Sequence, residues 1–459
     1  MNAKLMVFVG CLGQALMGLD AAPFKDGDVV VFFGDSITHG GRYHAYIADY
    51  YLTRFPSRNI RFVNSGIAGD TAAGAFQRIP EDVAEYAPTH VAFHFGMNDI
   101  DRSAYLPVST SESLVARERA QVAYRANMCK LIEGVRKAAP DATFIYLTPT
   151  PYEDRAVITN APTSGWASVN QVGCNVGLSL MAGFVIASAS AAKAEAVDWY
   201  SLLNNFRVRH QKDDPQFRFV RPDRVHPEEI GHSVMAWEFL KRQGVPSIVS
   251  EVEIDARSGA VRRAENAEVL SCQIDSRGAV FTVLAKSLPF PVHEKALPYL
   301  GEFDVENALN RETVRITGLV DGLYALKIDG VEVGCYAEKA LSVGVALGFN
   351  AKTPQYRQAQ DVFNRIEKLR QSEQVIRNYH AGRWFYSGRA PVDDVKALGE
   401  WFEKNESDKN GYYQQFVPGY LEYWPKYRMV REQLRKEQEE TRKLAQPLPR
   451  RYEIAKVSR

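Results

Sequence analysis

Three side chains in the first half of the sequence have the types and spacing that nucleophilic catalysis requires. Ser36 follows an apolar run of the chain, while Asp223 and His226 lie three residues apart at the far end of the same region. A serine hydroxyl becomes an effective nucleophile when a neighbouring base accepts its proton, and histidine is suited to this near neutral pH. A carboxylate on the other ring nitrogen fixes the histidine tautomer and stabilises the imidazolium. We therefore interpret Ser36, His226 and Asp223 as a nucleophile, its general base and the group that orients the base.

Attack on a carbonyl group also creates a negatively charged oxygen, which needs hydrogen-bond donors held in place beforehand. The sequence offers three such donors: the backbone N–H of Ser36, that of Gly69 in the segment NSGIAGDTA, and the side-chain amide of Asn98 in the segment HFGMND. Each donor of this kind is worth roughly 3–4 kcal/mol of transition-state stabilisation. Together the three groups predict an oxyanion hole beside the nucleophile.

Each of these residues also has an ordinary structural explanation when it is considered alone. Gly69 could be a turn glycine, Asn98 a loop residue after a strand, and Asp223 an N-terminal helix cap. Because all of them occur together, we favour the catalytic interpretation. Asp35 is expected to support the loop of the nucleophile and not to react. Five other histidines of this region are expected to be structural: His39, His44, His90, His94 and His232.

Strand-length apolar runs alternate with longer helical stretches from about residue 28 to residue 242. Five runs are expected to be strands: 29–33, 60–64, 90–95, 143–149 and 196–199. Helices are expected between them, for example over about 112–139 and 168–194. Near-continuous apolar strands are buried on both faces, which predicts a three-layer α/β/α domain with a parallel sheet. Because the candidate motifs follow strands or precede the last helix, they should meet at the carboxyl edge of this sheet.

The pattern of apolar residues changes twice after this α/β domain, which is expected over 24–246. From 248 to 345, apolar and polar residues alternate and Asp329-Gly330 is a good tight turn, which predicts a small antiparallel β domain. From 352 to 459 the helical period returns in a segment rich in aromatic residues. Five apolar residues fall on one helix face there, and we expect them to pack on the α/β domain: Tyr356, Ala359, Phe363, Ile366 and Leu369.

The composition is that of an ordinary globular protein. The 459 residues are 46% hydrophobic and 24% charged, with a formal net charge of +1, which argues against a broad electrostatic surface for nucleic acid. Residues 1–22 combine one lysine, an apolar run and small residues at Ala21 and Ala22, and are interpreted as a secretory signal peptide. The run is too short to be a comfortable membrane span. We expect a periplasmic or secreted protein; a lipoprotein anchored at Cys11 and a buried N-terminal helix are the alternatives.

Four further cysteines are scattered along the chain: Cys129, Cys174, Cys272 and Cys335. They form no disulfide framework, although an exported protein could hold a single bridge between Cys272 and Cys335. No CxxC motif and no clustered spacing of histidine and cysteine indicates a metal site. We therefore expect neither a metal nor another cofactor.

Taken together, the motifs resemble those of the SGNH, or GDSL-type, serine hydrolase family, and in particular its carbohydrate O-acetylesterases. The sequence GDS ending at Ser36 matches the first block of the family, and GDT beginning at Gly69 matches the second. GMND, which contains Asn98, matches the third block, and DRVH from Asp223 to His226 matches the fifth. The resemblance covers less than half of the chain. It implies the three-layer fold, an acyl-enzyme on Ser36 and the oxyanion hole described above.

The resemblance also implies a substrate that is an ester or thioester of a small molecule or a glycan. Export disfavours coenzyme A thioesters. The polar loop 149–168, in which Trp166 is an exposed-looking aromatic residue, favours a short acyl group on a sugar, most simply acetate. Trp384 opens an aromatic-rich segment whose rings could contact sugar, although such residues more often build cores. The alternatives are a lipase, arylesterase or lysophospholipase-like acyl hydrolase, or a non-catalytic glycan-binding protein on a hydrolase scaffold.

Overall fold

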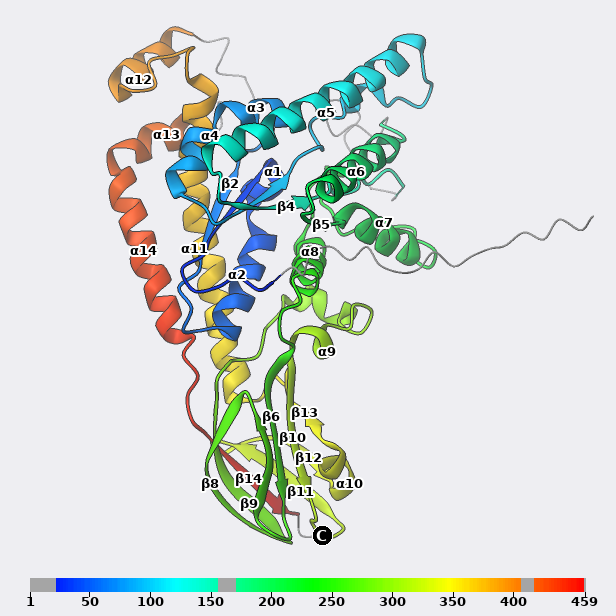
Figure 1. The fold of residues 1–459 in the computed structure, drawn as a ribbon, viewed down its shortest axis with the longest axis vertical. Coiled ribbons are helices and arrows are strands. Elements are labelled where there is room, and N and C mark those ends of the chain that lie inside the picture. Colours follow the sequence, from blue (N-terminus) through cyan, green and yellow to red (C-terminus); the bar gives the residue numbers. More distant parts are fainter. Residues whose placement is uncertain (1–21, 156–170, 406–416, 458–459) are drawn as a thin grey trace, which may run out of the picture.

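A five-stranded parallel sheet organises the first half of the chain (Figure 1). The computed structural model describes residues 22–155, 171–405 and 417–457. The strand order is β2–β1–β3–β4–β5, and all neighbours are parallel. All five strands lie where the apolar runs of the sequence predicted them: β1 (Val29–Gly34), β2 (Arg61–Gly66), β3 (His90–His94), β4 (Thr143–Leu147) and β5 (Glu195–Val197).

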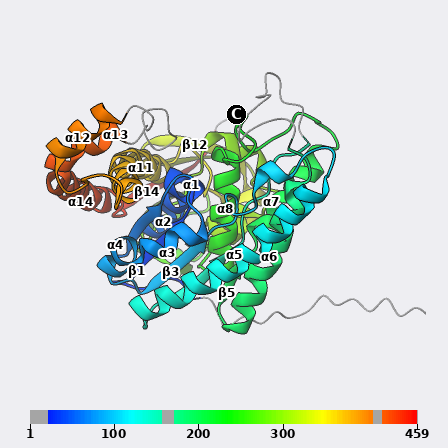
Figure 2. The same ribbon diagram turned by 90° about the horizontal axis from the view of Figure 1, so that it is seen from above.

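Helices cover both faces of this sheet, as Figure 2 shows from above. Alternate side chains of β1 enter different cores: Val30 and Phe32 face one helical layer, and Val31 and Phe33 face the other. The first layer consists of α2 (Arg42–Arg54), α7 (Trp199–His210) and α8 (Glu229–Arg242). The second consists of α3 (Ala72–Gln77), α5 (Ser111–Ala138) and α6 (Cys174–Ala191). The predicted three-layer α/β/α architecture is therefore confirmed.

By length and composition, α6 is the one described helix that could cross a membrane. Its residues Leu178, Met181 and Val185 are buried in the core beneath the sheet, together with side chains of α5. We therefore describe α6 as a core helix of the α/β domain.

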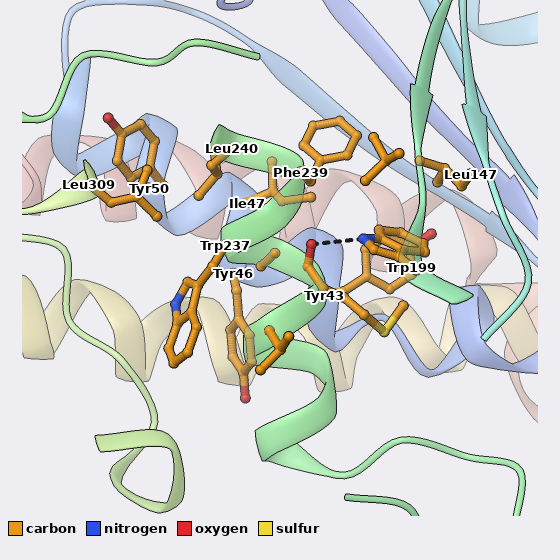
Figure 3. Close-up of a cluster of buried hydrophobic side chains, with 14 of the residues drawn as sticks. Tyr43, Tyr46, Ile47, Tyr50, Leu147, Trp199, Trp237, Phe239, Leu240 and Leu309 are labelled. Atoms are coloured by element: carbon orange, nitrogen blue, oxygen red, sulfur yellow. Dashed lines mark hydrogen bonds between the residues drawn. The ribbon is translucent and has the colours of Figure 1, made fainter. Parts of the chain in front are cut away.

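The core between α2 and α8 is rich in aromatic side chains (Figure 3). Trp199 of α7 reaches into it, and its indole N–H donates a hydrogen bond to the carbonyl oxygen of Met235 at 3.0 Å. Leu309, the last residue of α9 (Val305–Leu309), belongs to the same cluster although it follows the α/β domain in the sequence. The α/β core is thus completed by downstream parts of the chain.

Two β-sheets follow the α/β domain and pack around one shared core. Their strand orders are β13–β10–β6–β7 and β12–β11–β14–β9–β8. The predicted turn at Asp329-Gly330 joins β11 to β12, with positive φ angles of 49° and 79° at its two residues. The strands are β6 (Ile248–Asp255), β7 (Ala260–Glu265), β8 (Ala267–Asp275), β9 (Gly278–Ala285), β10 (Arg311–Thr317), β11 (Leu323–Ile328), β12 (Val331–Ala337), β13 (Val345–Ala346) and β14 (Arg450–Lys456).

This β unit differs from the sequence prediction in two respects. First, β6 and β10 pair in parallel, so the unit over 248–345 is not wholly antiparallel. The long connection between the two strands, which contains α9, supplies the crossover that parallel pairing needs. Second, β14 lies between β9 and β11, so the segment 352–459 is not helical throughout. The β domain is therefore built from two separate stretches of sequence.

The four described cysteines are free, which corrects the suggested disulfide. Cys272 lies on β8 and Cys335 on β12, and these strands form the two opposite edges of the same five-stranded sheet. Because neighbouring strands lie roughly 4.8 Å apart, the two cysteines are well beyond disulfide reach. The mismatch arises because the sequence alone did not reveal the strand order.

A long helix, α11 (Pro354–Tyr386), runs from the β unit along the side of the α/β domain (Figure 1). The five residues of its predicted apolar face are all buried. Among them, Phe363 stacks on Tyr46 of α2 with ring centroids 5.6 Å apart. The expectation that this face packs on the α/β domain is therefore confirmed.

The other C-terminal helices are α12 (Val395–Lys404), α13 (Val417–Tyr423) and α14 (Tyr427–Leu444). Aromatic residues of α11, α12 and α13 build a small core of their own, which includes Tyr386, Phe402 and Tyr420. Core packing is thus the main role of the aromatic residues in the described part of this segment.

Candidate active site

Ser36, His226 and Asp223 form a continuous hydrogen-bonded chain. Nε2 of His226 lies 2.8 Å from Oγ of Ser36, and Nδ1 of His226 lies 2.7 Å from Oδ2 of Asp223. The side chains of His226 and Asp223 are each 21% exposed, so solvent can reach these two catalytic side chains. A proton on Nδ1 can be donated to Asp223, which leaves Nε2 to accept the proton of Ser36. The structure thus brings together two residues, Ser36 and His226, that are 190 positions apart in the sequence.

Ser36 is the first residue of the short helix α1 (Ser36–Gly40), at the carboxyl end of β1. Asp35 caps this helix, because its Oδ1 accepts a hydrogen bond from the N–H of Ile37 at 2.9 Å. Asp35 therefore supports the loop, as expected. The first N–H groups of a helix have no acceptor within the helix, so the N–H of Ser36 can serve as an oxyanion donor.

The loop of Asp223 and His226 is fixed by hydrogen bonds to its own backbone. Oδ1 of Asp223 accepts from the N–H groups of Val225 and His226, both at 3.0 Å. Burial acts to raise the pKa of Asp223, but the hydrogen bonds from the His226 ring and from the two N–H groups hold the pKa below its ordinary value. Arg224 has a left-handed φ of 68°, and its carbonyl oxygen accepts from the N–H of Glu153 at 2.9 Å. The carboxylate is thus kept ionised and directed at His226.

Gly69 and Asn98 lie just after β2 and β3, the two strands that flank β1. Gly69 has a φ of 80°, in the left-handed region that favours glycine. Within the described residues, the backbone N–H groups of Ser36 and Gly69 have no hydrogen-bond acceptor. Nδ2 of Asn98 donates to the carbonyl oxygen of Asp70 at 2.9 Å, which ties the two loops together. The three predicted donors therefore come from neighbouring strand ends, at the position where this sheet order places ligands.

Two further carboxyl groups lie close to the site. Burial raises the pKa of Asp35 to about 6, and the hydrogen bond from Ile37 and the charge of His226 oppose this only in part. Burial also raises the pKa of Asp99 to about 7, although its Oδ1 accepts from the N–H of Ala72 at 3.0 Å. Ionisation of either group in the folded protein therefore costs free energy.

Of the two tryptophans that we expected to contact substrate, the structure describes one. Trp166 lies outside the described residues. Trp384, on α11, packs against the small cluster of Ile67 and Ala381, and Ile67 lies in the loop that leads to Gly69. Trp384 is thus close to the oxyanion side of the site, and its contact with substrate stays a prediction.

The histidines to which we assigned structural roles are buried or partly buried. Burial lowers the pKa of His39 to about 3 and that of His44 to about 4, so both are neutral. His44 Nε2 lies 3.1 Å from the carbonyl oxygen of Thr38, which it holds by a hydrogen bond. Among the residues that the structure describes, no group of three or more His, Cys, Asp or Glu side chains could hold a metal ion.

Comparison with known families gives this site its context. Residues 32–234 match the model of the GDSL-like lipase/acylhydrolase family. The α/β domain belongs to this family. The matched range contains all five residues of the site: Ser36, Gly69, Asn98, Asp223 and His226.

Two similar proteins extend the comparison. An acetylxylan esterase of Geobacillus stearothermophilus is 26% identical over an alignment of 238 residues that covers 48% of this chain and 94% of the relative. A solved structure described as a gut microbial diltiazem-metabolizing enzyme is 27% identical, with a TM-score of 0.86. That structure matches 95% of this chain and 99% of its own. The likeness to the second protein therefore includes the β unit and the C-terminal helices.

The sequence analysis did not identify the buried charged residues that hold the loops of this site in place. Arg102 donates from Nη1 to Oδ1 of Asn98 at 3.4 Å and to the carbonyl oxygen of Met97. Arg78, Asp82 and Arg377 are buried and charged, and none of them belongs to a recognised motif. Such residues look like solvated surface positions in a sequence, and only the fold shows that they are enclosed.

Proposed function

We propose that this protein is a serine esterase that removes O-acetyl groups from carbohydrate through an acyl-enzyme on Ser36. The observation that carries the proposal is the chain of short contacts from Ser36 Oγ to His226 Nε2, at 2.8 Å, and from His226 Nδ1 to Asp223, at 2.7 Å. The family assignment supports acyl hydrolysis.

The reaction begins when Nε2 of His226 accepts the Ser36 proton and Oγ attacks the carbonyl carbon of the ester. The negative charge on the carbonyl oxygen is stabilised by the N–H groups of Ser36 and Gly69 and by the side-chain amide of Asn98. His226 then protonates the leaving alcohol oxygen, and the acyl group remains on Ser36. In the second half, His226 accepts a proton from water, the hydroxyl attacks the acyl-enzyme, and the carboxylic acid leaves as Ser36 recovers its proton.

Acetate on a sugar is the proposed form of the substrate. The acetylxylan esterase relative supports it at 26% identity over 238 residues. Trp384, packed beside the loop of Gly69, supports it as an aromatic surface close to the oxyanion side.

A second candidate is hydrolysis of small esters that are not carbohydrates, as in the arylesterase alternative. The observation that favours it is the match over 95% of the chain to the protein described as a diltiazem-metabolizing enzyme. The two candidates share one chemistry and differ in what the site accepts beyond the acyl group.

Rates of ester hydrolysis on a panel of substrates would decide between them. The panel contains an O-acetylated xylo-oligosaccharide, diltiazem, and aryl esters from acetyl to octanoyl, with Ser36→Ala as the control for background hydrolysis. If the proposal holds, kcat/KM is highest on the acetylated glycan and falls at least about tenfold from acetyl to octanoyl, because a short polar acyl pocket gives long chains nothing to bury against. A rise with chain length would support a lipase, and binding of glycan without any turnover would support the non-catalytic alternative.

We also propose that the protein is exported and that residues 1–22 are removed on the way. Those residues carry the signal-peptide pattern, and residues 1–21 lie outside the described part of the chain. Sequencing of the mature N-terminus after expression in a bacterial host tests this. Cleavage next to Ala21 or Ala22 supports free secretion, whereas a lipid-modified Cys11 would establish the lipoprotein.

A further inference from the structure

The second half of α11 contacts the two loops that carry Ser36 and Gly69, although α11 lies outside the range matched by the family model. Arg370 donates from Nη1 to the carbonyl oxygen of Gly40, the last residue of α1, at 3.0 Å. Gln374 donates to the carbonyl oxygen of His39. The helix therefore approaches the nucleophile's short helix from the side of β2, the edge strand of the sheet.

Arg377 is the most deeply placed of these contacts, with 2% of its surface exposed. Its guanidinium forms a two-point ion pair with Asp82, at 2.8 Å from Nη1 to Oδ1 and 3.0 Å from Nη2 to Oδ2. Its Nε donates to the carbonyl oxygen of Gly66 at 3.0 Å. Burial opposes the charge of Arg377, but Asp82 outweighs burial and raises the pKa of the guanidinium. Arg377 therefore stays charged and holds the end of β2, three residues before Gly69.

Asp82 also forms an ion pair with Arg78. Nη1 of Arg78 lies 2.6 Å from Oδ2 of Asp82, and Nε of Arg78 lies 2.7 Å from Oδ2 of Asp70. Nη2 of Arg78 also donates to the carbonyl oxygen of Gly34 at 2.9 Å. The buried series Arg377–Asp82–Arg78–Asp70 thus ends on the residue after Gly69 and also touches the backbone two residues before Ser36.

A second, separate contact from α11 reaches the residue before Gly69. Nδ1 of His39 accepts a hydrogen bond from the N–H of Ala68 at 3.0 Å, and Nε2 of His39 lies 3.1 Å from Oδ1 of Asn378. Because Oδ1 of Asn378 is an acceptor, it favours the His39 tautomer with its proton on Nε2, which leaves Nδ1 free to accept from Ala68. Asn378 therefore fixes the ring that holds the oxyanion loop.

We propose that α11 is part of the catalytic apparatus, and that Arg377 and Asn378 are positioning residues that hold the Gly69 N–H in the oxyanion hole. Arg377 acts through Asp82, Arg78 and Asp70, and Asn378 acts through His39 and Ala68. The inference rests on the esterase function proposed above, since it concerns the same site.

The physical reason is that oxyanion stabilisation depends on the placement of the donor before the reaction. Removing one donor typically costs about 100- to 1000-fold in kcat, while the substrate's ground-state binding is largely retained. A donor that is displaced but still present should cost less than that. The contacts of α11 hold the backbone at Gly66 directly and at Ala68 through His39, in addition to the bond from Asn98 to Asp70. Loss of the α11 contacts should therefore loosen the donor and leave the hydrogen bonds among Ser36, His226 and Asp223 in place.

The test compares kcat and KM of the full chain on phenyl acetate for wild type, Arg377→Met, Arg377→Lys and Asn378→Ala. Arg383→Met serves as the matched control, because Arg383 is also on α11 but pairs with Asp393 at 2.8 Å and with Glu81 at 3.7 Å, and neither carboxylate belongs to the Arg377–Asp82–Arg78–Asp70 series. Each protein is also assayed on the thiono analogue of phenyl acetate, in which sulfur replaces the carbonyl oxygen and gains less from the oxyanion donors. Active-site titration and thermal unfolding report the fraction of folded, reactive protein.

For Arg377→Met we expect a fall in kcat of about 10- to 100-fold with KM changed by less than about twofold. We expect a smaller loss on the thiono ester, partial recovery in Arg377→Lys, and no change in Arg383→Met. Asn378→Ala, whose side chain is only half-buried, should show the same pattern more weakly and remains testable if Arg377→Met does not fold. An unchanged kcat per titrated site, or equal losses on the oxygen and thiono esters, would overturn the inference. If wild type hydrolyses no ester, the proposed function itself fails, which is a different result.

Discussion

Asp35, the residue before the nucleophile, should lower the free energy of unfolding as the pH rises. Its side chain is 1% exposed, and burial raises its pKa from the ordinary 3.8 to about 6. A carboxyl group with a raised pKa binds its proton more tightly in the folded state than in the unfolded state. Its contribution to stability is therefore fully present below pH 3.8 and is lost as the pH rises through about 6.

The substitution Asp35→Asn isolates this contribution. Asparagine keeps the oxygen that accepts from Ile37 N–H and is an equally good helix N-cap, but it carries no charge to bury. The difference between 3.8 and about 6 corresponds to about 3 kcal/mol. We therefore expect the variant to be more stable than wild type by up to about 3 kcal/mol at pH 8, and to show little difference near pH 4.

Urea unfolding at a series of pH values, followed by fluorescence, measures this difference. The matched control is Asp394→Asn, because Asp394 caps α12 in the same way, accepting from the N–H groups of Lys396 and Ala397, but is exposed. The control should shift stability by the same small amount at every pH. A difference between wild type and Asp35→Asn that does not change between pH 4 and pH 8 would refute the argument from burial.

Three further predictions follow from the described contacts. Trp384→Ala should reduce kcat/KM on an acetylated glycan by about tenfold and on an aryl acetate by much less; equal losses would assign Trp384 to packing on Ile67 and Ala381. Truncation after Gln243 should give insoluble or unfolded protein, because it removes Phe290, Phe303 and Leu309 from the α2–α8 core; a soluble and active fragment would contradict this. Chelation with EDTA should leave the rate of ester hydrolysis unchanged, and a loss that added metal restores would contradict the metal-free mechanism.

The α/β domain could be predicted from the sequence because local patterns specify it. Buried parallel strands are read as continuous apolar runs, so β1 and β3 were found within one residue of their observed ends. The candidate site could be predicted for a related reason: its residues follow strand ends, and parallel strands bring their carboxyl ends to one edge. Ser36 and His226 were then identified by their residue types and by the family motifs GDS and DRVH.

The remaining parts depend on contacts between distant segments that no local pattern reveals. In the sequence, β14 is a short segment of alternating polar and apolar residues near a charged helix. Its partner strands β9 and β11 lie far earlier in the chain. The apolar face of α11 could be recognised in the sequence up to Leu369. Arginine and asparagine are usually surface residues, so the sequence did not indicate the roles of Arg377 and Asn378. Only the fold shows that Arg377 is enclosed by Asp82 and the end of β2.

Loss of acetate release in Ser36→Ala tests the central claim most directly. Wild type and Ser36→Ala are purified in parallel, their folding is compared by circular dichroism, and acetate release from phenyl acetate and from an O-acetylated xylo-oligosaccharide is measured. The account predicts that kcat falls at least about a thousandfold on both substrates in a folded variant, since nucleophile and base act as a unit. A folded Ser36→Ala protein that releases acetate at a rate close to wild type would contradict it.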